Sequence, residues 1–326
     1  MRICVYGAGA IGGHVAARLA KGGAEVSVVA RGAHLRAMQE KGLTVHAFDG
    51  VMHCRPRASA DPADLGPQDA VIVTVKAPSL PDVAAGIAPL LHAGTSVAFV
   101  MNGIPWWFFD KLKGAAPGQT LPMLDPGEAI RRTVGVERTL GGIVYSAATV
   151  TEPGVVLAQA RDPRVVLGEL DGAMTPRLAA LAAAIAAGGM GGEAVPDIRR
   201  FVWGKLLSNL MTGPLCCLCR SSIRQAMAQP AVHAAALRAG EEVVALAAAY
   251  GHDIADAMAA RLARAANYDH KPSILQDLEL GRAMEVDSLW QAPLELARRA
   301  GVPMPTLELS IQLATQAARA AGLYRN

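Results

Sequence analysis

The segment RICVYGAGAIGG, residues 2–13, decides the fold of the first half of the chain. An apolar strand-like run opens directly into a glycine turn, and the turn leads into the helix-like segment IGGHVAARLAKGG. The glycines have the spacing G-x-G-x-x-G, which allows a tight turn, close approach of a pyrophosphate to the backbone, and close helix–strand packing. The helix N-terminus adds free N–H groups and a partial positive charge. Although a plain strand-to-helix turn also favours glycine, this context predicts a dinucleotide-binding turn. Its residues are Gly7, Ala8, Gly9, Ala10, Ile11 and Gly12.

Strand-like and helix-like patterns continue to alternate after this turn. Near-continuous apolar runs such as EVSVV, AVIVTV and SVAFV are separated by helix-like segments. This order indicates a parallel sheet that is covered on both faces. Further strands are predicted at 139–150, 154–160 and 164–170.

Beyond AVPDIRR, residues 194–200, the strand pattern ends and alanine- and leucine-rich helices are predicted, among them 230–251 and 272–289. The predicted fold class is therefore α/β: an N-terminal Rossmann-type domain with a parallel sheet, followed by a C-terminal all-α domain. The predicted domains span residues 1–195 and 196–326.

Composition excludes several classes of protein. A hydrophobic share of 52% with 18% charged residues is typical of a folded globular protein. The net charge of +3 comes without a Lys/Arg block, so no nucleic-acid partner is expected. The alanine-rich stretch 178–189 is too short for a membrane span, and the N-terminus has no signal-peptide pattern.

Five cysteines, three of them in CCLC (216–219), indicate a reducing compartment and are interpreted as small buried hydrophobes. No metal site is predicted, because no matching Cys or His cluster follows.

The end of the second predicted strand indicates the cofactor. NAD-binding proteins usually carry an acidic residue about 20 positions after the glycines, whereas here the strand ends in Arg31. A guanidinium can hold a 2′-phosphate bidentately, which favours NADP(H); the alternative is a solvated arginine. Lys76 and Asn102 follow later strands, at the sheet edge where ligands bind, although Asn-Gly is also an ordinary turn dipeptide.

A polar stripe runs along the predicted helix FVWGKLLSNLMT, residues 201–212. Its members recur at i, i+3, i+4 and i+7, so they share one face while apolar side chains cover the rest. The members are Lys205, Ser208, Asn209 and Thr212. The stripe is either the solvated side of the helix or a buried face, and a buried ammonium needs a partner because an unpaired buried charge is costly.

Glu285 is the predicted partner of Lys205. Spacings of four, three and four residues place Glu285 on the apolar stripe of the predicted helix 272–289, whose start fits a capping box of Ser273 and Gln276. The pair is either a structural bridge or a functional one, and buried bridges are weak sources of stability. For carbonyl reduction, a lysine held by a carboxylate and an asparagine would neutralise the developing alkoxide. Ser273 would cap its helix or bind a substrate carboxylate.

These motifs make the chain resemble the ketopantoate reductase family (2-dehydropantoate 2-reductases). The matching pieces occur in family order over nearly the whole length: GAGAIGG, Arg31, Lys76, the NG of Asn102, EPG at 152–154, WGKLLSN and SILQDLELGRAME. The resemblance implies an NADP domain, a helical domain and an active site in the cleft between them. It implies Lys205 as the general acid, with Asn102 and Glu285 beside the nicotinamide. It also implies that Asn209 and Ser273 contact the substrate.

The departures from the family pattern concern the substrate. Gly213 stands where the family usually has a second asparagine, and LCCLCRSSIRQ offers only Ser221 and Ser222 for another. VDSLWQ (286–291) replaces a pattern like D-Y-x-N-G. Trp106 and Trp107 follow the NG dipeptide, either near the expected cleft or as packing. Loss of hydroxyl-binding groups would relax or move specificity.

The predicted function is NADPH-dependent reduction of a 2-keto acid. The family resemblance implies that this acid is ketopantoate, which is reduced to pantoate in pantothenate and coenzyme A biosynthesis. One alternative is a related reductase of a bulkier keto acid, ketone or imine. Another is a non-catalytic NADP(H)-binding redox sensor, which would need no proton donor. A cytoplasmic location is expected, and the apolar helices of the second half would offer a homodimer interface.

Overall fold

The structure is a computed structural model that describes residues 1–258, 260–261 and 269–324. The chain forms two compact units, which are described separately. The first comprises residues 1–101 and 106–198, and the second comprises 102–105 and 199–326. The short segment 102–105 therefore leaves the first unit and joins the mostly helical second one.

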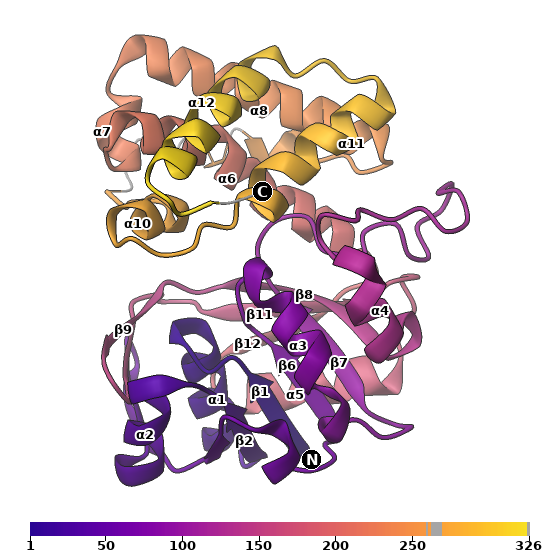
Figure 1. Ribbon diagram of the computed structural model, residues 1–326, viewed down its shortest axis with the longest axis vertical. Coiled ribbons are helices and arrows are strands. Elements are labelled where there is room, and N and C mark those ends of the chain that lie inside the picture. Colours follow the sequence, from indigo (N-terminus) through magenta and orange to yellow (C-terminus); the bar gives the residue numbers. More distant parts are fainter. Residues whose placement is uncertain (259, 262–268, 325–326) are drawn as a thin grey trace. The chain divides into compact units, whose positions relative to one another are not determined.

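The first unit is built on a mainly parallel sheet with the strand order β12-β11-β8-β7-β6-β1-β2-β5 (Figure 1). Among the described strands of this sheet, only β8 and β11 pair in antiparallel fashion, so the predicted fold class is confirmed. The strands are β1 (Arg2–Tyr6), β2 (Glu25–Val29), β5 (Arg57–Ser59), β6 (Ala70–Val73), β7 (Ser96–Val100), β8 (Thr139–Tyr145), β11 (Arg164–Glu169) and β12 (Gly191–Ala194).

A second, four-stranded sheet in the first unit has the order β4-β3-β10-β9, and the sequence patterns did not predict it. Its strands are β3 (Leu43–Ala47), β4 (Gly50–Cys54), β9 (Ala148–Glu152) and β10 (Val155–Ala158). The single strand expected at 139–150 is wrong for this reason: β8 ends at Tyr145 in the main sheet, and β9 begins at Ala148 in the other. Alternation of side chains alone does not tell which of two sheets a strand joins.

Both faces of the main sheet are buried, which explains its continuous apolar strands. Ile3, Val5 and Ile72 belong to a core that also contains apolar residues of α1 and α5. Side chains of the opposite parity, such as Val71 and Phe99, are buried as well. The helices of the first unit are α1 (Ala10–Lys21), α2 (Gly32–Lys41), α3 (Leu80–Gly86), α4 (Ala129–Thr133) and α5 (Pro176–Ala187).

The second unit is helical (Figure 1). Its elements include α6 (Ile198–Cys219, whose first residue still belongs to the first unit), α7 (Ile223–Met227), α8 (Pro230–Ala249), α10 (Ser273–Glu279), the π-helix η6 (Asp287–Gln291), α11 (Ala292–Ala300) and α12 (Pro305–Ala320). None of the helices in the described part of the chain is long and apolar enough to cross a membrane. Cys4, Cys216 and Cys217 are buried as expected, Cys54 is half-buried, and Cys219 is exposed, contrary to the expectation.

The single helix expected over residues 272–289 is wrong. α10 ends at Glu279, and Gly281 adopts φ +65°, a left-handed conformation that stops a helix. The predicted capping box is also wrong: Pro272 precedes the helix, Ser273 is its first residue, and the Gln276 amide donates to the Lys271 carbonyl. Glu285 lies directly before the next helix. The non-helical segment between the two helices, and not a stripe on one helix, therefore brings Glu285 into the interior.

Candidate active site

The glycine turn lies between β1 and α1, and its first glycine is held in a conformation that other residues rarely adopt. Gly7 has φ +96°, and its N–H and that of Ala8 both donate to the carbonyl of Val29, at 3.0 Å. A Cβ on Gly7 would lie 2.5 Å from Val75 Cγ1. The turn is therefore fixed by backbone bonds to β2 and by close packing against the end of β6.

The other two glycines of the motif have opposite surroundings. A Cβ on Gly12 would lie 2.4 Å from the Gly7 carbonyl oxygen, so only glycine fits between α1 and the turn. A Cβ on Gly9 would meet no described atom within 4 Å, so the space in front of this residue is open. An open backbone at the start of a helix is the arrangement that a pyrophosphate needs.

Thr74 is part of this turn and was missed by sequence reasoning. Its hydroxyl donates to the carbonyl of Gly7 at 2.9 Å, and its N–H donates to the carbonyl of Tyr6. A threonine just after a buried strand gives no distinct sequence pattern, because the contact depends on the pairing of β6 with β1.

Arg31 follows β2 and precedes α2, with an extended backbone. Its guanidinium donates to Asp82 of α3 at 3.0 Å, and more than half of each side chain is exposed. An exposed pair of this kind contributes at most about 1 kcal/mol, so a phosphate could compete for the arginine at little cost. Lys76 lies after β6 and is exposed. Both side chains are thus at the carboxyl ends of parallel strands, in the first unit.

Lys205 lies on α6 in the second unit, and its pKa is lowered to about 8. Burial is the largest cause, the Glu285 carboxylate opposes it, and the positive charge of Arg261 adds to it. The Glu285 side chain is itself buried, at 6% exposure. The second unit therefore brings together the lysine and the carboxylate that the sequence proposed as partners.

Arg261 was not predicted as a site residue. Its guanidinium donates a hydrogen bond to Ser208, one turn along α6 from Lys205, and the Thr212 hydroxyl donates to the Ser208 carbonyl at 2.9 Å. The polar stripe of α6 is thus only partly exposed, and a residue far along the chain covers one side of it. No local pattern around Arg261 predicts this contact.

Asn102 joins the same unit through the segment that follows it. Gly103 has φ +82°, and a Cβ on it would lie 2.5 Å from the Ser288 carbonyl oxygen. The Ile104 N–H donates to that oxygen at 2.8 Å. The Asn102 Oδ1 and Ser288 Oγ atoms are buried without a hydrogen-bond partner among the described residues, as expected for groups that await a ligand or water. Ser288 was not predicted; it lies in a π-helix, a feature frequent at functional sites.

Asn209 and Ser273 also lie in the second unit. Asn209 is half-buried one turn after Lys205, and Ser273 is exposed at the first position of α10. The following residue, Ile274, approaches α6: a Cβ on Gly213 would lie 3.5 Å from Ile274 Cγ2. The structure therefore places the start of α10 near the same helix as Lys205.

Trp106 and Trp107 pack in the first unit. Trp106 is 3% exposed and meets Phe99 edge to face, at 5.5 Å between ring centroids. Trp107 is 1% exposed, and a Cβ on Gly141 of β8 would lie 2.6 Å from its ring. Of the two interpretations of these tryptophans, the structure supports packing.

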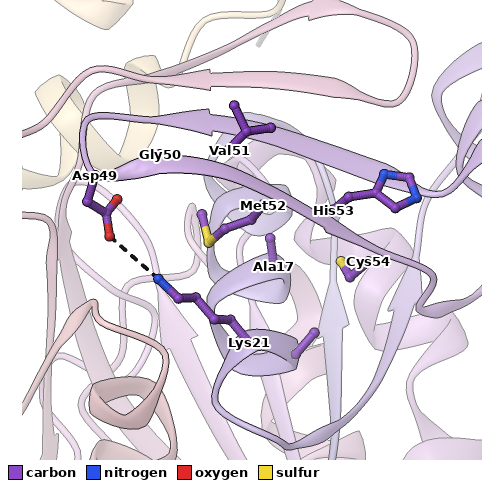
Figure 2. A pocket seen from close by; sticks show the side chains of 9 residues that line it. Ala17, Lys21, Asp49, Gly50, Val51, Met52, His53 and Cys54 are labelled. Atoms are coloured by element: carbon purple, nitrogen blue, oxygen red, sulfur yellow. Dashed lines mark ion pairs between the residues drawn. The ribbon is translucent and has the colours of Figure 1, made fainter.

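A cavity of about 330 Å³ lies elsewhere in the first unit, between the end of α1 and β4 (Figure 2). It is lined by Ala17, Ala20, Lys21, Asp49, Gly50, Val51, Met52, His53 and Cys54. Asp49 pairs with the buried Arg18 at 2.5 Å and with Lys21 at 3.7 Å, and the hydrogen bond from Arg18 is the main cause that lowers the pKa of Asp49 to about 2. These charges attach the turn between β3 and β4 to α1, and none of the predicted site residues lines the cavity.

Comparisons with known proteins agree with the geometry of both units. Residues 3–172 match the family described as ketopantoate reductase PanE/ApbA, and residues 197–318 match the C-terminal part of that family. A 2-dehydropantoate 2-reductase from Mesorhizobium japonicum is 38% identical, covering 99% of this chain and 100% of the relative.

Solved structures give the same result. A candidate ketopantoate reductase from Ralstonia solanacearum MolK2 has a TM-score of 0.91 at 38% identity, covering 99% of each chain. A 2-dehydropantoate 2-reductase from Geobacter metallireducens GS-15 has a TM-score of 0.86 at 27% identity, covering 97% of this chain and all of the other. Over nearly its whole length, the chain belongs to the ketopantoate reductase family and is an NADP-dependent oxidoreductase.

Proposed function

We propose that the protein reduces a 2-keto acid to the 2-hydroxy acid with NADPH, and that ketopantoate, giving pantoate, is such a substrate. The observation that carries this proposal is the partly buried Lys205, whose pKa is lowered to about 8 beside the buried Glu285. The name of the Mesorhizobium relative supports the choice of substrate.

The first unit fits the cofactor. The open backbone at Gly9 would receive the pyrophosphate at the start of α1, and Arg31 would exchange Asp82 for the 2′-phosphate. The exposed Lys76 adds a second cation, which like Arg31 follows the carboxyl end of a parallel strand. When bound, NADPH supplies the hydride.

Lys205 would hold the proton that the reaction requires. A pKa of about 8 leaves the ammonium protonated at neutral pH while making it a stronger acid than an ordinary lysine. Its Nζ would donate to the carbonyl oxygen of the substrate as negative charge develops there. Glu285 would keep the ammonium charged and oriented.

The other predicted residues would position the reactants. We assign Asn102, together with Glu285, to the nicotinamide end of the cofactor, and Asn209 and Ser273 to the substrate, following the family resemblance. The orphaned Asn102 Oδ1 supports a ligand at that point. The homodimer and the cytoplasmic location stay predictions.

The test is the loss of NADPH absorbance when purified protein meets ketopantoate, beside a panel of other 2-keto acids. We expect NADPH oxidation that matches the 2-hydroxy acid formed. Tight NADPH binding without turnover of any compound would contradict the proposal and favour a non-catalytic NADP(H)-binding protein.

A further inference from the structure

We propose that the Ser146 hydroxyl donates a hydrogen bond to NADPH, at an oxygen between the pyrophosphate and the nicotinamide, and that His14 is the positioning residue that fixes this direction. The role deepens the proposed function and rests on one part of it, the placement of NADPH at the glycine turn. The sequence patterns did not indicate either residue.

A chain of hydrogen bonds runs from Asp49 along the buried side of α1. Asp49 accepts two hydrogen bonds from the Arg18 guanidinium, at 2.5 and 2.7 Å, and the Gly188 carbonyl accepts another at 3.3 Å. The Arg18 Nε–H donates to His14 Nε2 at 3.1 Å. Arg18 is 2% exposed and His14 is 1% exposed, so this geometry is shielded from water.

The bond from Arg18 decides which ring nitrogen of His14 carries the proton. A guanidinium can only donate, so His14 Nε2 must accept. Burial, assisted by the positive charge of Arg18, lowers the pKa of His14 to about 4, so the ring is neutral at neutral pH. In a neutral ring the other nitrogen carries the hydrogen. His14 Nδ1 therefore donates to Ser146 Oγ, 3.1 Å away.

Ser146 is thus an acceptor toward His14 and keeps its own O–H for another group. Among the described residues, His14 is the hydrogen-bond partner that the structure shows for this hydroxyl. Ser146 is half-buried, unlike His14, and so remains within reach of a ligand. The same order of donors excludes Ser146 as a nucleophile activated by His14, because an activating base must accept the serine proton.

Ser146 lies at the edge of the main sheet where the glycine turn also lies. It directly follows β8, and β8, β7, β6 and β1 run parallel, so their carboxyl ends share one edge. The bond to His14 also brings Ser146 beside α1. His14 is four residues after Ala10, where α1 begins, which is about 6 Å along the helix axis.

The strand order indicates which half of the cofactor comes near Ser146. Arg31 follows β2, which lies on the opposite side of β1 from β8. With the 2′-phosphate assigned to Arg31 and the pyrophosphate to the start of α1, the rest of NADPH extends toward the side of β6, β7 and β8. The acceptors for Ser146 are therefore oxygens of the pyrophosphate, the nicotinamide ribose or the carboxamide.

The experiment measures the Kd for NADPH and for adenosine 2′,5′-bisphosphate, which keeps the 2′-phosphate but lacks the pyrophosphate and the nicotinamide half. The proteins are the wild type, Ser146→Ala, His14→Gln and the double variant. Glutamine can still accept from Arg18 but places no donor at the position of Nδ1. His14→Asn does the reverse, because its amide nitrogen falls near that position.

Thr44→Val is the matched control. Thr44 Oγ1 contacts the Nδ1 atom of His53 at the same distance of 3.1 Å, but this pair joins β3 and β4 of the second sheet. Loss of that hydroxyl removes a histidine–hydroxyl contact of the first unit away from the proposed cofactor edge.

We expect Ser146→Ala and His14→Gln each to raise the Kd for NADPH about tenfold, as for loss of one hydrogen bond, and to leave the Kd for adenosine 2′,5′-bisphosphate within about twofold. The double variant should bind NADPH no more than about twofold more weakly than Ser146→Ala, because both changes remove the same contact. His14→Asn and Thr44→Val should stay within about threefold of the wild type.

An unchanged Kd for NADPH in Ser146→Ala overturns the proposal. Losses that multiply in the double variant would show that His14 acts through the fold and not through Ser146. Gly9→Ala separates this failure from that of the proposed function. If Gly9→Ala weakens NADPH binding and Ser146→Ala does not, only the role of Ser146 fails; if neither variant does, the placement of the cofactor fails as well.

Discussion

Burial lowers the pKa of the Lys205 ammonium to about 8, and the carboxylate of Glu285 is the group that opposes this shift. Arg261 acts in the same direction as burial. The acidity of the proposed proton donor is therefore set by its burial and by two charged groups of the same unit, Glu285 and Arg261. Each of these two side chains can be changed separately.

The first prediction concerns the pH dependence of reduction. A general acid must be protonated, so kcat/KM should fall as the pH rises through about 8. Glu285→Gln removes the opposing charge and should move the midpoint to lower pH, whereas Arg261→Gln should move it to higher pH. Profiles of kcat/KM against pH test this. Identical midpoints in all three proteins would show that Lys205 does not govern the profile.

The second prediction concerns stability. The folded-state pKa of Lys205 lies below the value of 10.5 for an unperturbed lysine, so between about pH 8 and 10.5 the unfolded chain binds more protons. The free energy of unfolding contributed by this group should rise with pH across that window. Lys205→Met combined with Glu285→Gln should be more stable than the wild type at neutral pH, by about 1 kcal/mol or more, because neither charge of the pair stays buried. The difference should shrink towards pH 10. Urea unfolding at several pH values measures it, and a difference that grows with pH would contradict the sign.

The third prediction concerns cofactor choice. Arg31→Ala should raise the Kd for NADPH by about 10- to 100-fold, the value of a hydrogen bond to a charged group, and leave the Kd for NADH nearly unchanged. Arg36→Ala is the matched control, since Arg36 is an exposed arginine on α2, the helix that follows Arg31. Titration of protein fluorescence with both nucleotides provides the values. Equal losses for NADPH and NADH would show that Arg31 does not read the 2′-phosphate.

The fourth prediction separates the two roles of glycine in the turn. Gly12→Ala would force its methyl group against the Gly7 carbonyl and should lower Tm by several degrees. Gly9→Ala has free space and should keep the wild-type Tm, but its methyl group would enter the space proposed for the pyrophosphate. The Kd for NADPH should therefore rise at least tenfold in Gly9→Ala. Unchanged binding in that variant would place the cofactor elsewhere.

Much of the first unit could be predicted because its information is local. A glycine motif between a strand and a helix specifies the turn, and the apolar runs specify strands buried on both faces. The second sheet was not predicted because β9 and β8 are separated only by Ser146 and Ala147, and pairing with β10 is a long-range choice.

In the helical unit, the sequence predicted individual site residues but not the contacts that bring them together. The stripe of α6 identified Lys205, and a buried acid was expected at Glu285, but the helix assumed to carry that acid ends at Glu279, before the left-handed Gly281. Arg261 and Ser288 were not predicted because each contributes through contacts between distant segments. Ser288, for example, is recognisable only once Gly103 packs against its backbone.

The measurement that tests the central claim most directly is kcat/KM for the reduction of ketopantoate by Lys205→Ala, with the Kd for NADPH measured on the same protein. Lys111→Ala is the control, since that lysine pairs with Glu137 in the first unit and has no part in the proposed site. If Lys205 donates the proton, its removal should lower kcat/KM by about 100-fold or more while NADPH binding and the control remain at wild-type values. A Lys205→Ala enzyme within about threefold of the wild type would contradict the account.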